Sequence, residues 1–381
     1  MDFSLSDEQR MLDDTVTRLV RERYGFAQRA GYGTEPGGYS AEMWGLFAEL
    51  GLLGVPFSDD DGGIGGGGAE LMILHQAFGR ALVREPYLAT VVLGGGMVAR
   101  LGSPEQREAL LPAVIGGETT LALAYAEPEG RYDPQWVETR AAADGDGYRL
   151  SGRKAVVLNG DSADRLVVTA RTAGAVDGCG GLSAFLVDPA AAGVTVRGYP
   201  TIDGQRAADI RFDGVRVEAA DRLGAEGEAA DALEAVLAAG CAALAAEAVG
   251  AMEAACEQTL EYLKTRKQFG VPIGRFQVLQ HRMVDMRIAL EQARSMAILA
   301  AASLDRPAAE RERTVSAAKT LIGTAGRFVA EQAIQMHGGM GMTDETPVSH
   351  YAKRLVMIDH WLGDSGHHLA RFMALPEPAG H

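Results

Sequence analysis

The chain has 381 residues, of which 47% are hydrophobic and 23% charged, a composition typical of a globular protein with room for two or three cores. Its net charge of −15 argues against binding nucleic acid or an anionic membrane through bulk charge. The acidic opening segment does not resemble a signal peptide, and no apolar run is long enough to predict a membrane span. We therefore expect a cytoplasmic protein with neither nucleic acid nor a membrane as partner.

The three cysteines, Cys179, Cys241 and Cys256, are far apart and form no C-x-x-C pair. This spacing predicts free thiols in a reducing compartment rather than a disulfide framework or a zinc site.

Residues 1–117 read as a helical domain. Ser6 and Gln9 predict a capping box, and Ser103, Pro104 and Gln106 predict a second helix start. The glycine run "DDDGGIGGGGAE" at 59–70 lies between them. No strand precedes it and no Walker lysine follows, so it predicts a flexible loop rather than a phosphate-binding one.

Residues 118–226 change to a two-residue hydrophobic period. Short strand-like runs such as "YRLSGRKAVVL", "ADRLVVTAR" and "ADIRFDGVRV" alternate with turns, with no helical crossover between them. The pattern predicts an antiparallel sheet or barrel.

Residues 227–381 return to helical spacing, with long Ala-rich stretches at 227–266, 276–304 and 314–339 and a fourth through 354–372. These lengths favour a four-helix bundle. The fold class is therefore α+β, with a helical domain, a middle antiparallel β-domain and a C-terminal four-helix bundle.

Two motifs in the last region are suited to a phosphate-containing ligand. In "YLKTRKQFGVPIGRFQVLQH", Arg266 offers a bidentate fork to a phosphate, Phe269 an aromatic face and Gln277 a paired donor and acceptor. In "QMHGGMGMT", Gln335 precedes Gly338 and Gly339, where backbone can approach a ligand closely.

In this order and on this layout, the two motifs resemble the acyl-CoA dehydrogenase family over essentially the whole chain. "REPYLATVVLGGG", "EYLKTRKQFGVPIGRFQVLQHR" and "KRLVMIDHWLGDSGHHLAR" are most similar to the small subunit of pimeloyl-CoA dehydrogenase. The resemblance implies FAD as cofactor, a tetramer, an acyl-CoA substrate and electron-transferring flavoprotein as acceptor. It implies that the distal part of FAD is held by Arg266, Gln268, Phe269, Phe276, Gln277, Gln335, Gly338 and Gly339.

The resemblance also shows what the chain lacks. The family's usual base is a glutamate in a Tyr-Glu-Gly-Thr-like motif, which falls on Trp361–Asp364 and places Leu362 at the base. The alternative base position, on the first long bundle helix, is Gly240. Neither residue can accept a proton, and Asp364 is the nearest carboxylate.

The side that would hold the flavin ring departs as well. In "AEPEGRYD", Ala126 and Tyr132 replace a threonine and a serine of the family pattern. In "KAVVLNG", Val156 and Leu158 replace a tryptophan and a threonine. The resemblance thus predicts an eroded ring-binding half beside an intact adenosine-binding half.

Four interpretations stay open. The chain is a subunit of a heteromeric dehydrogenase that completes a homologous partner's FAD site, or a self-sufficient homotetramer with an unusual base such as Asp364. It is otherwise an oxidase, or a scaffold that keeps only the fold. The resemblance suggests a dicarboxyl-CoA or another bulky acyl-CoA, such as one with a steroid side chain.

The C-terminal cluster of acids and histidines admits three interpretations. Asp364 could be the base if Gly363 breaks the helix there. A metal site is less favoured, and we predict none. We expect His360, Asp364, His367 and His368 to be surface or subunit-contact residues around a vacated catalytic position.

Overall fold

The computed structural model describes residues 4–178 and 180–376, so Cys179 lies outside the described residues. Cys241 and Cys256 are buried free thiols, as predicted. The chain forms two compact units, one made of Tyr32–Gly66 and Arg84–Gly240 and the other of the described residues up to Gly31, Gly67–Val83 and the residues from Cys241 onward. The domain bounds predicted from the sequence, after residues 117 and 226, stay a prediction.

The unit containing the C-terminal region is helical. Its elements are α1 (Asp7–Arg23), α2 (Phe26–Tyr32), α4 (Gly68–Ala81), α7 (Ala230–Thr265, which begins in the other unit), β9 (Lys267–Gln268), β10 (Val271–Pro272), η6 (Ile273–Arg275), α8 (Gln277–Ala302), α9 (Ala308–His337), η7 (Gly338–Met342), α10 (Pro347–His360) and α11 (Ser365–Ala374).

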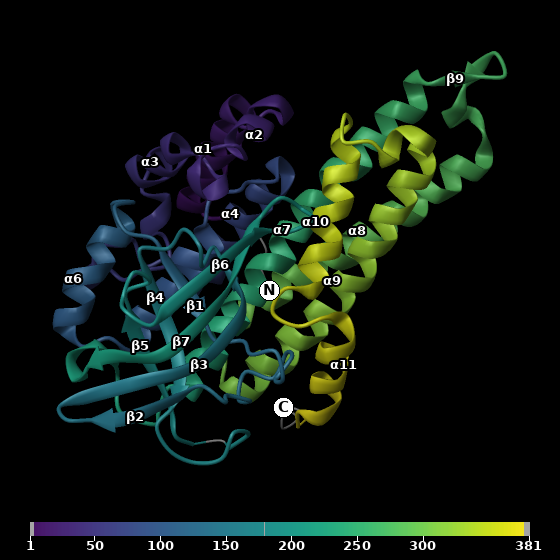
Figure 1. Ribbon diagram of the computed structural model, residues 1–381. Helices are drawn as coiled ribbons and strands as arrows, with labels where there is room; N and C mark the ends of the chain where they lie inside the picture. The colour runs from purple at the N-terminus through teal and green to yellow at the C-terminus, as the bar shows by residue number, and fades with distance from the viewer. Residues whose placement is uncertain (1–3, 179, 377–381) are drawn as a thin grey trace. The chain divides into compact units, whose positions relative to one another are not determined.

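These helices pack closely because small residues line their interfaces. Helices α8 and α10 lie against α9, and the β9–β10 hairpin extends beyond the ends of α7 and α8 (Figure 1). Ala293, Ala297 and Ala300 of α8 are buried. A Cβ on Gly68 of α4 would lie 2.1 Å from the Ala301 carbonyl oxygen, so this crossing requires glycine.

Helix α7 is, within the described part of the chain, long and apolar enough to span a membrane by length and composition. Its apolar window is 89% buried inside the protein, which is the behaviour of a core helix.

The other unit holds the sheet and several short helices. Its helices are η1 (Pro36–Gly38), α3 (Ala41–Glu49), η2 (Leu52–Gly54), η3 (Asp59–Asp61), η4 (Leu88–Gly95), α5 (Gly96–Leu101), α6 (Pro104–Ile115) and η5 (Ala219–Asp221). Its strands are β1 (Leu121–Ala124), β2 (Arg140–Asp144), β3 (Gly147–Leu158), β4 (Arg165–Arg171), β5 (Leu182–Val187), β6 (Val194–Pro200), β7 (Arg206–Glu218) and β8 (Arg222–Leu223).

The strands form one sheet in the order β6-β7-β3-β2-β4-β5-β8, with β1 added beside β4. Most neighbours are antiparallel, whereas β1 and β4 run parallel, as do β2 and β4 at one bridge. Inward side chains such as Leu150, Val168 and Phe185 are fully buried and form the core of the sheet.

The predicted fold class is confirmed. Both predicted capping boxes form, with Ser6 accepting from the Gln9 backbone and Ser103 from the Gln106 backbone. The glycine run leads into α4, and it is tied down rather than open. Asp61, near its start, accepts two hydrogen bonds of 2.8 Å from Arg107, which hold the pKa of that carboxyl below its usual range.

Candidate functional site

An exposed turn links α7 to α8 and contains most of the predicted cofactor residues. Residues 267–272 form the short β9–β10 hairpin, and the Ile273 backbone N–H closes it on the Arg266 carbonyl at 2.8 Å. Phe269 takes a left-handed φ of 53° and is 90% exposed. Its ring lies edge-on to Phe276 at 6.1 Å. We call residues 264–282 the arm.

The arm is basic on an otherwise acidic protein. Between residues 262 and 284 there is no carboxylate, whereas the cationic residues are Lys264, Arg266, Lys267, Arg275 and Arg282. Arg266, Gln268 and Gln277 are exposed on it. An aromatic face beside exposed cations is the chemistry that an adenine and a diphosphate require.

The second motif lies against the base of the arm. His337, the last residue of α9, stacks on Tyr262 of α7 with ring centroids 4.4 Å apart. Tyr262 is one helical turn before Arg266, so the ends of α7 and α9 meet here. Gln335, Gly338 and Gly339 at the end of α9 are exposed, and a Cβ on either glycine would meet nothing within 4 Å.

The structure therefore brings the two predicted cofactor motifs to one end of the bundle. Exposed cations, an aromatic pair and uncovered backbone at Gly338 and Gly339 fit the diphosphate and adenosine part of a dinucleotide. Assignment of the individual residues to FAD stays a prediction.

The position expected for the base lies between two helices. Helix α10 ends at His360 and α11 starts at Ser365, so the helix is broken as an Asp364 base would require. Leu362 and Gly363 take left-handed φ angles of 60° and 107°. A Cβ on Gly363 would lie 2.7 Å from His368 Nε2, so only glycine fits there.

A buried polar cluster fixes this turn. The Lys319 amine donates to the carbonyls of Ile358 at 2.6 Å and Asp359 at 3.2 Å. His368 Nε2 lies 3.0 Å from the Leu362 carbonyl, to which it donates. His368 Nδ1 then accepts from the Ser316 hydroxyl at 3.4 Å.

Burial sets the charge states in the cluster. It lowers the pKa of His368 to about 3, with the nearby Lys319 charge acting in the same direction, so the ring is neutral. Burial also lowers the pKa of the Lys319 amine, although Cys241, Asp359 and Asp364 oppose the shift. The prediction of His368 as a surface or subunit-contact residue is wrong, because it is 5% exposed and its ring contacts Ser316 and Leu362 of its own chain.

Cys241 of α7 lies against the turn that contains Leu362. Gly240 precedes Cys241 in α7, and Cys241 Sγ is 3.8 Å from the Leu362 carbonyl and 3.9 Å from His368 Nε2. Of the two nearby carboxylates, Asp359 accepts from the Ser365 backbone at 3.0 Å, and Asp364 caps α11 by accepting from the His367 backbone at 2.7 Å. Within the described ranges, no group of three acidic, histidine or cysteine side chains is placed to hold a metal.

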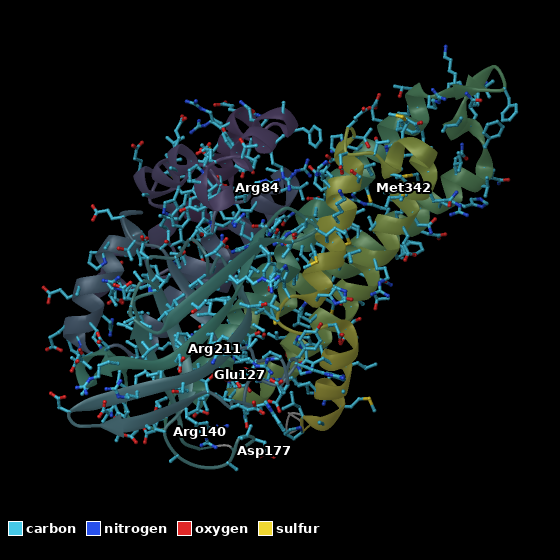
Figure 2. The ribbon with its side chains drawn as sticks, in the orientation of Figure 1. Arg84, Glu127, Arg140, Asp177, Arg211 and Met342 are labelled. Atoms are coloured by element: carbon cyan, nitrogen blue, oxygen red, sulfur yellow. The ribbon has the colours of Figure 1, made fainter. Side chains whose placement is uncertain are left out.

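In the other unit, two residues from the segments compared with the family pattern, Glu127 and Lys154, form a buried ion pair. Glu127 lies beside the strands (Figure 2) and accepts from Lys154 Nζ at 2.7 Å, with both residues almost fully buried. Burial lowers the pKa of Lys154 to about 8 against the attraction of Glu127. Burial would raise the pKa of Glu127, but Lys154 and the backbone donors of Glu138 and Thr139 hold it below its usual range.

The flavin-ring side contains a strained bulge. The pairing of β3 with β7 shifts between Lys154 and Val157. Val156 takes a φ of 54° there, with 47% of its surface exposed, and its N–H donates to Asp209 at 3.2 Å. A β-branched residue at positive φ costs roughly 1–3 kcal/mol, and such strain clusters at functional sites. Val156 and Leu158, the aliphatic residues predicted to have lost the ring contacts, lie at or beside this bulge.

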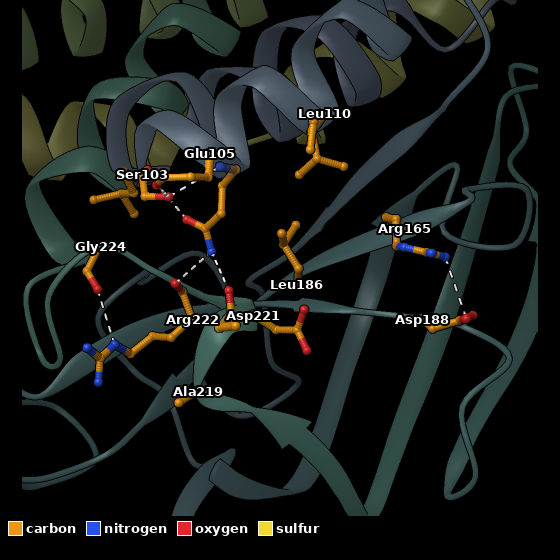
Figure 3. A pocket seen from close by; sticks show the side chains of 14 residues that line it. Ser103, Glu105, Leu110, Arg165, Leu186, Asp188, Ala219, Asp221, Arg222 and Gly224 are labelled. Carbon is orange, nitrogen blue, oxygen red and sulfur yellow. Dashed lines mark hydrogen bonds and ion pairs between the residues drawn. The ribbon is translucent and has the colours of Figure 1, made fainter. Parts of the chain in front are cut away.

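A cavity of about 900 Å³ lies in the same unit as the sheet, between α6 and β5 and β8 (Figure 3). Gln106, which lines the cavity, donates from Nε2 to the carbonyls of Ala220 at 2.7 Å and Arg222 at 3.0 Å. Arg165 and Asp188, also in the lining, form an ion pair at 3.5 Å. None of the residues predicted for the cofactor or the base lines it.

Sequence reasoning missed Lys319, Cys241 and the buried role of His368. A signal for Lys319 was present, because it falls on the apolar stripe of α9 with Val315 and Ile322, where a solvated lysine would not lie. Contacts with residues distant in sequence cannot be read from such a stripe.

Comparison with known families agrees with this geometry. The models described as acyl-CoA dehydrogenase N-terminal, middle and C-terminal domain match residues 6–118, 122–215 and 230–373. A curated relative, the probable acyl-CoA dehydrogenase YngJ of Bacillus subtilis (strain 168), is 31% identical over 350 residues, covering 91% of each chain.

Solved structures give the same result. A variant of the Tcur3481-Tcur3483 steroid ACAD is 30% identical with a TM-score of 0.86, covering 97% of this chain and 98% of the other. The ChsE4-ChsE5 complex of Mycobacterium tuberculosis is 27% identical with a TM-score of 0.87, at 99% and 100% coverage. The FAD complex of PigA is 26% identical with a TM-score of 0.89, at 98% coverage of each.

These matches span all three parts of the chain and include FAD-bound relatives. The cofactor is FAD, and the activity is of the acyl-CoA dehydrogenase type, acting on a CH–CH bond. The chain belongs to the acyl-CoA dehydrogenase family.

Proposed function

We propose that this chain is a subunit of a heteromeric acyl-CoA dehydrogenase. Its arm would bind the distal part of an FAD that is held mainly by a homologous partner subunit. The partner would supply the catalytic base and the pocket for the flavin ring. The pair would oxidise an acyl-CoA thioester between its second and third carbons, and electron-transferring flavoprotein would accept the electrons.

One observation supports this proposal above all others. The base position holds Leu362, and its turn is tied to the protein by Lys319 and His368. Both nearby carboxylates, Asp359 and Asp364, accept backbone hydrogen bonds of the same turn. A base must be free to take the α-proton of the substrate, so a fixed turn without a free carboxylate favours a base on another chain.

The exposed groups of the arm also support the proposal. Its exposed cations Arg266 and Lys267 and its 90% exposed Phe269 have no evident use in folding, because exposed groups contribute little to stability. Both would be used if a diphosphate and an adenine from a neighbouring subunit rested on them. The names of two structural relatives, Tcur3481-Tcur3483 and ChsE4-ChsE5, each join two components.

The substrate proposal follows the same relatives and the likeness to the pimeloyl-CoA dehydrogenase small subunit. We infer a bulky acyl-CoA, either a dicarboxyl-CoA or a steroid side chain, since one relative is named a steroid ACAD. A self-sufficient homotetramer with Asp364 as base, an oxidase and a flavin-free scaffold are the alternatives that the experiments below separate.

The test is to measure FAD binding by the complex in which this chain carries Arg266→Ala and the copurified partner is wild type. Loss of charge-assisted hydrogen bonds to a diphosphate weakens FAD binding by roughly 10- to 100-fold. Arg282→Ala is the matched control, because Arg282 lies on the same arm but donates to Gln332 at 2.5 Å. Both variants should still assemble with the partner.

The equivalent arginine change in the partner's own arm completes the design. If the FAD site is shared, this change in the partner leaves the flavin bound. The partner's arm would then face the ring pocket of this chain, which is predicted to be eroded and to hold no flavin. Wild-type FAD affinity in the Arg266→Ala pair would contradict the proposal. Equal flavin loss from either change would favour a homotetramer-like site in each chain.

A further inference from the structure

A second cavity, of about 480 Å³, lies where the arm joins the end of α7 to the start of α8. The hairpin of the arm extends beyond the ends of these two helices (Figure 1). At the cavity the arm comes close to α7, since a Cβ on Gly274 would lie 2.9 Å from the Leu263 carbonyl oxygen. Gln280 Nε2 donates to the Gly274 carbonyl at 2.9 Å and holds this turn in place. We call this space the arm cavity.

Most of the lining of the arm cavity is aliphatic. Leu263 is 2% exposed, Leu260 is 42% exposed, and Pro272 and Met283 are half-buried. Among the described residues, no aromatic or acidic side chain lines the cavity. A nucleobase favours an aromatic face such as that of Phe269, which lies elsewhere on the arm. The lining therefore suits an alkyl chain, which gains from burial against aliphatic groups.

Two cations complete the lining. Lys264 of α7 and Arg275 of η6 are both exposed, and in the described part of the chain neither pairs with a carboxylate. The acidic residues nearest to the arm in sequence, Glu261 and Asp285, do not line the cavity. Two like charges on one cavity repel each other, and an anion between them would offset that repulsion. A carboxylate has two oxygens, so it can accept from an ammonium and a guanidinium group at once.

We propose that the arm cavity binds an aliphatic carboxylate. Its alkyl chain would lie against Leu260, Leu263 and Met283, and its carboxylate would accept from Lys264 and Arg275. A free medium-chain fatty acid has this chemistry. None of the eight residues predicted to hold FAD lines the cavity, so the site is separate from theirs and does not depend on the proposed function.

The test is a titration with octanoate of the protein in the assembly in which it is purified, with FAD present at saturation. Methionines labelled with ¹³C in their methyl groups report where octanoate binds, because Met283 lines the cavity and a Met283→Leu variant assigns its signal. Octanoate should shift the Met283 signal to saturation and leave that of Met11, on α1, in place. The alcohol 1-octanol has no carboxylate and should bind roughly 10-fold more weakly.

Variants and a shorter acid separate the roles of the two cations and of the lining. Lys264→Met/Arg275→Met should weaken octanoate binding by roughly 10-fold. Arg282→Met is the matched control, because it removes a cation of the same arm that does not line the cavity, and it should change the affinity little. Hexanoate is two methylene groups shorter than octanoate and should bind roughly 5- to 15-fold more weakly.

Three results would overturn the proposal. Equal affinities for octanoate and 1-octanol would show that the cations play no part. A loss of affinity in Arg282→Met as large as in the double variant would show that only the general charge of the arm matters. A Met283 signal that octanoate does not shift would show that the cavity is closed in the assembled protein. In each case, FAD bound at the expected ratio in the same sample leaves the proposed function intact.

Discussion

Leu362 is the residue on which the account depends. Its φ of 60° is uncommon for a side chain of this size and costs roughly 1–2 kcal/mol. His368 on its carbonyl and Gly363 after it maintain that conformation. The turn is thus fixed by contacts of its own chain, although the residue at the position expected for the base is apolar.

Asp364 separates the two enzyme interpretations at this scale. Asp364→Ala removes the N-cap of α11 and should lower the free energy of unfolding by about 1 kcal/mol, while turnover of the assembled enzyme is unchanged. Urea unfolding and steady-state rates measure the two effects. Asp364→Asn keeps a capping oxygen and should restore stability. A large loss of turnover in both variants would instead identify Asp364 as the base.

His368 predicts a dependence of stability on pH. Its pKa falls from an ordinary 6.5 to about 3 in the folded protein, so between these values the unfolded chain holds one more proton. Stability is then complete above pH 6.5 and is lost as the pH falls toward 3, by about 1.4 kcal/mol per pH unit for this one group.

His368→Gln keeps an N–H donor but removes the titration. Between pH 6.5 and pH 4, its free energy of unfolding should fall less steeply with pH than that of the wild type. The difference between the two slopes should correspond to the uptake of one proton on unfolding. The exposed His360→Gln variant is the control. Identical slopes for wild type and His368→Gln would show that the ring is protonated in the folded protein.

The register of the motif around Leu362 leads to the prediction that this chain lacks the base, and that stays a prediction. The surroundings of Leu362 could not be predicted, because Lys319 and His368 reach the turn from other helices. A histidine in a polar C-terminal segment has no local feature that distinguishes a buried partner from a surface residue.

At the scale of elements, a buried ion pair joins α7 to α10. Arg354 donates to Glu247 at 2.6 Å and 2.8 Å in a two-point contact, and both residues are at most 5% exposed. The cost of removing two charges from water offsets much of their attraction, so the pair adds little net stability. Its two-point geometry instead fixes how the two helices meet.

Breaking this pair should be costly. Arg354→Met leaves the Glu247 carboxylate buried and unpaired, and it should lower the free energy of unfolding by about 3–5 kcal/mol. The double variant Glu247→Met/Arg354→Met should recover most of that loss. Arg287→Met breaks the exposed pair with Glu291 and should change stability little. A small effect of Arg354→Met would show that water reaches Glu247.

The elements predicted best were those with strong local signals. The capping boxes at Ser6 and Ser103 form, and α7, α8 and α9 cover the stretches that hydrophobic spacing predicted to be helical. The prediction of one fourth helix through 354–372 is wrong, because the chain turns between α10 and α11. Strand β2, with its short alanine run, was missed because Ala has little strand preference. The π-helix at Leu88–Gly95 was not predicted, since π-helical turns are rare.

At the scale of the whole molecule, charge is unevenly distributed. The chain has a net charge of −15, yet residues 262–284 contain five cations and no carboxylate. Such a region is attracted to anions against the field of its own protein. In this region the family likeness and the physical chemistry point to the same ligand, a diphosphate. The assignment of its residues to FAD, and the loss of ring contacts elsewhere in the chain, stay predictions.

The measurement that tests the central claim most directly is the visible spectrum and flavin-to-chain ratio of this protein, purified alone and with its homologous partner. The account predicts a colourless protein alone and about one FAD per pair in the complex, because the ring pocket and base belong to the partner. A strong flavin band near one FAD per chain in the protein purified alone would contradict it, since the eroded half would then hold the ring unaided.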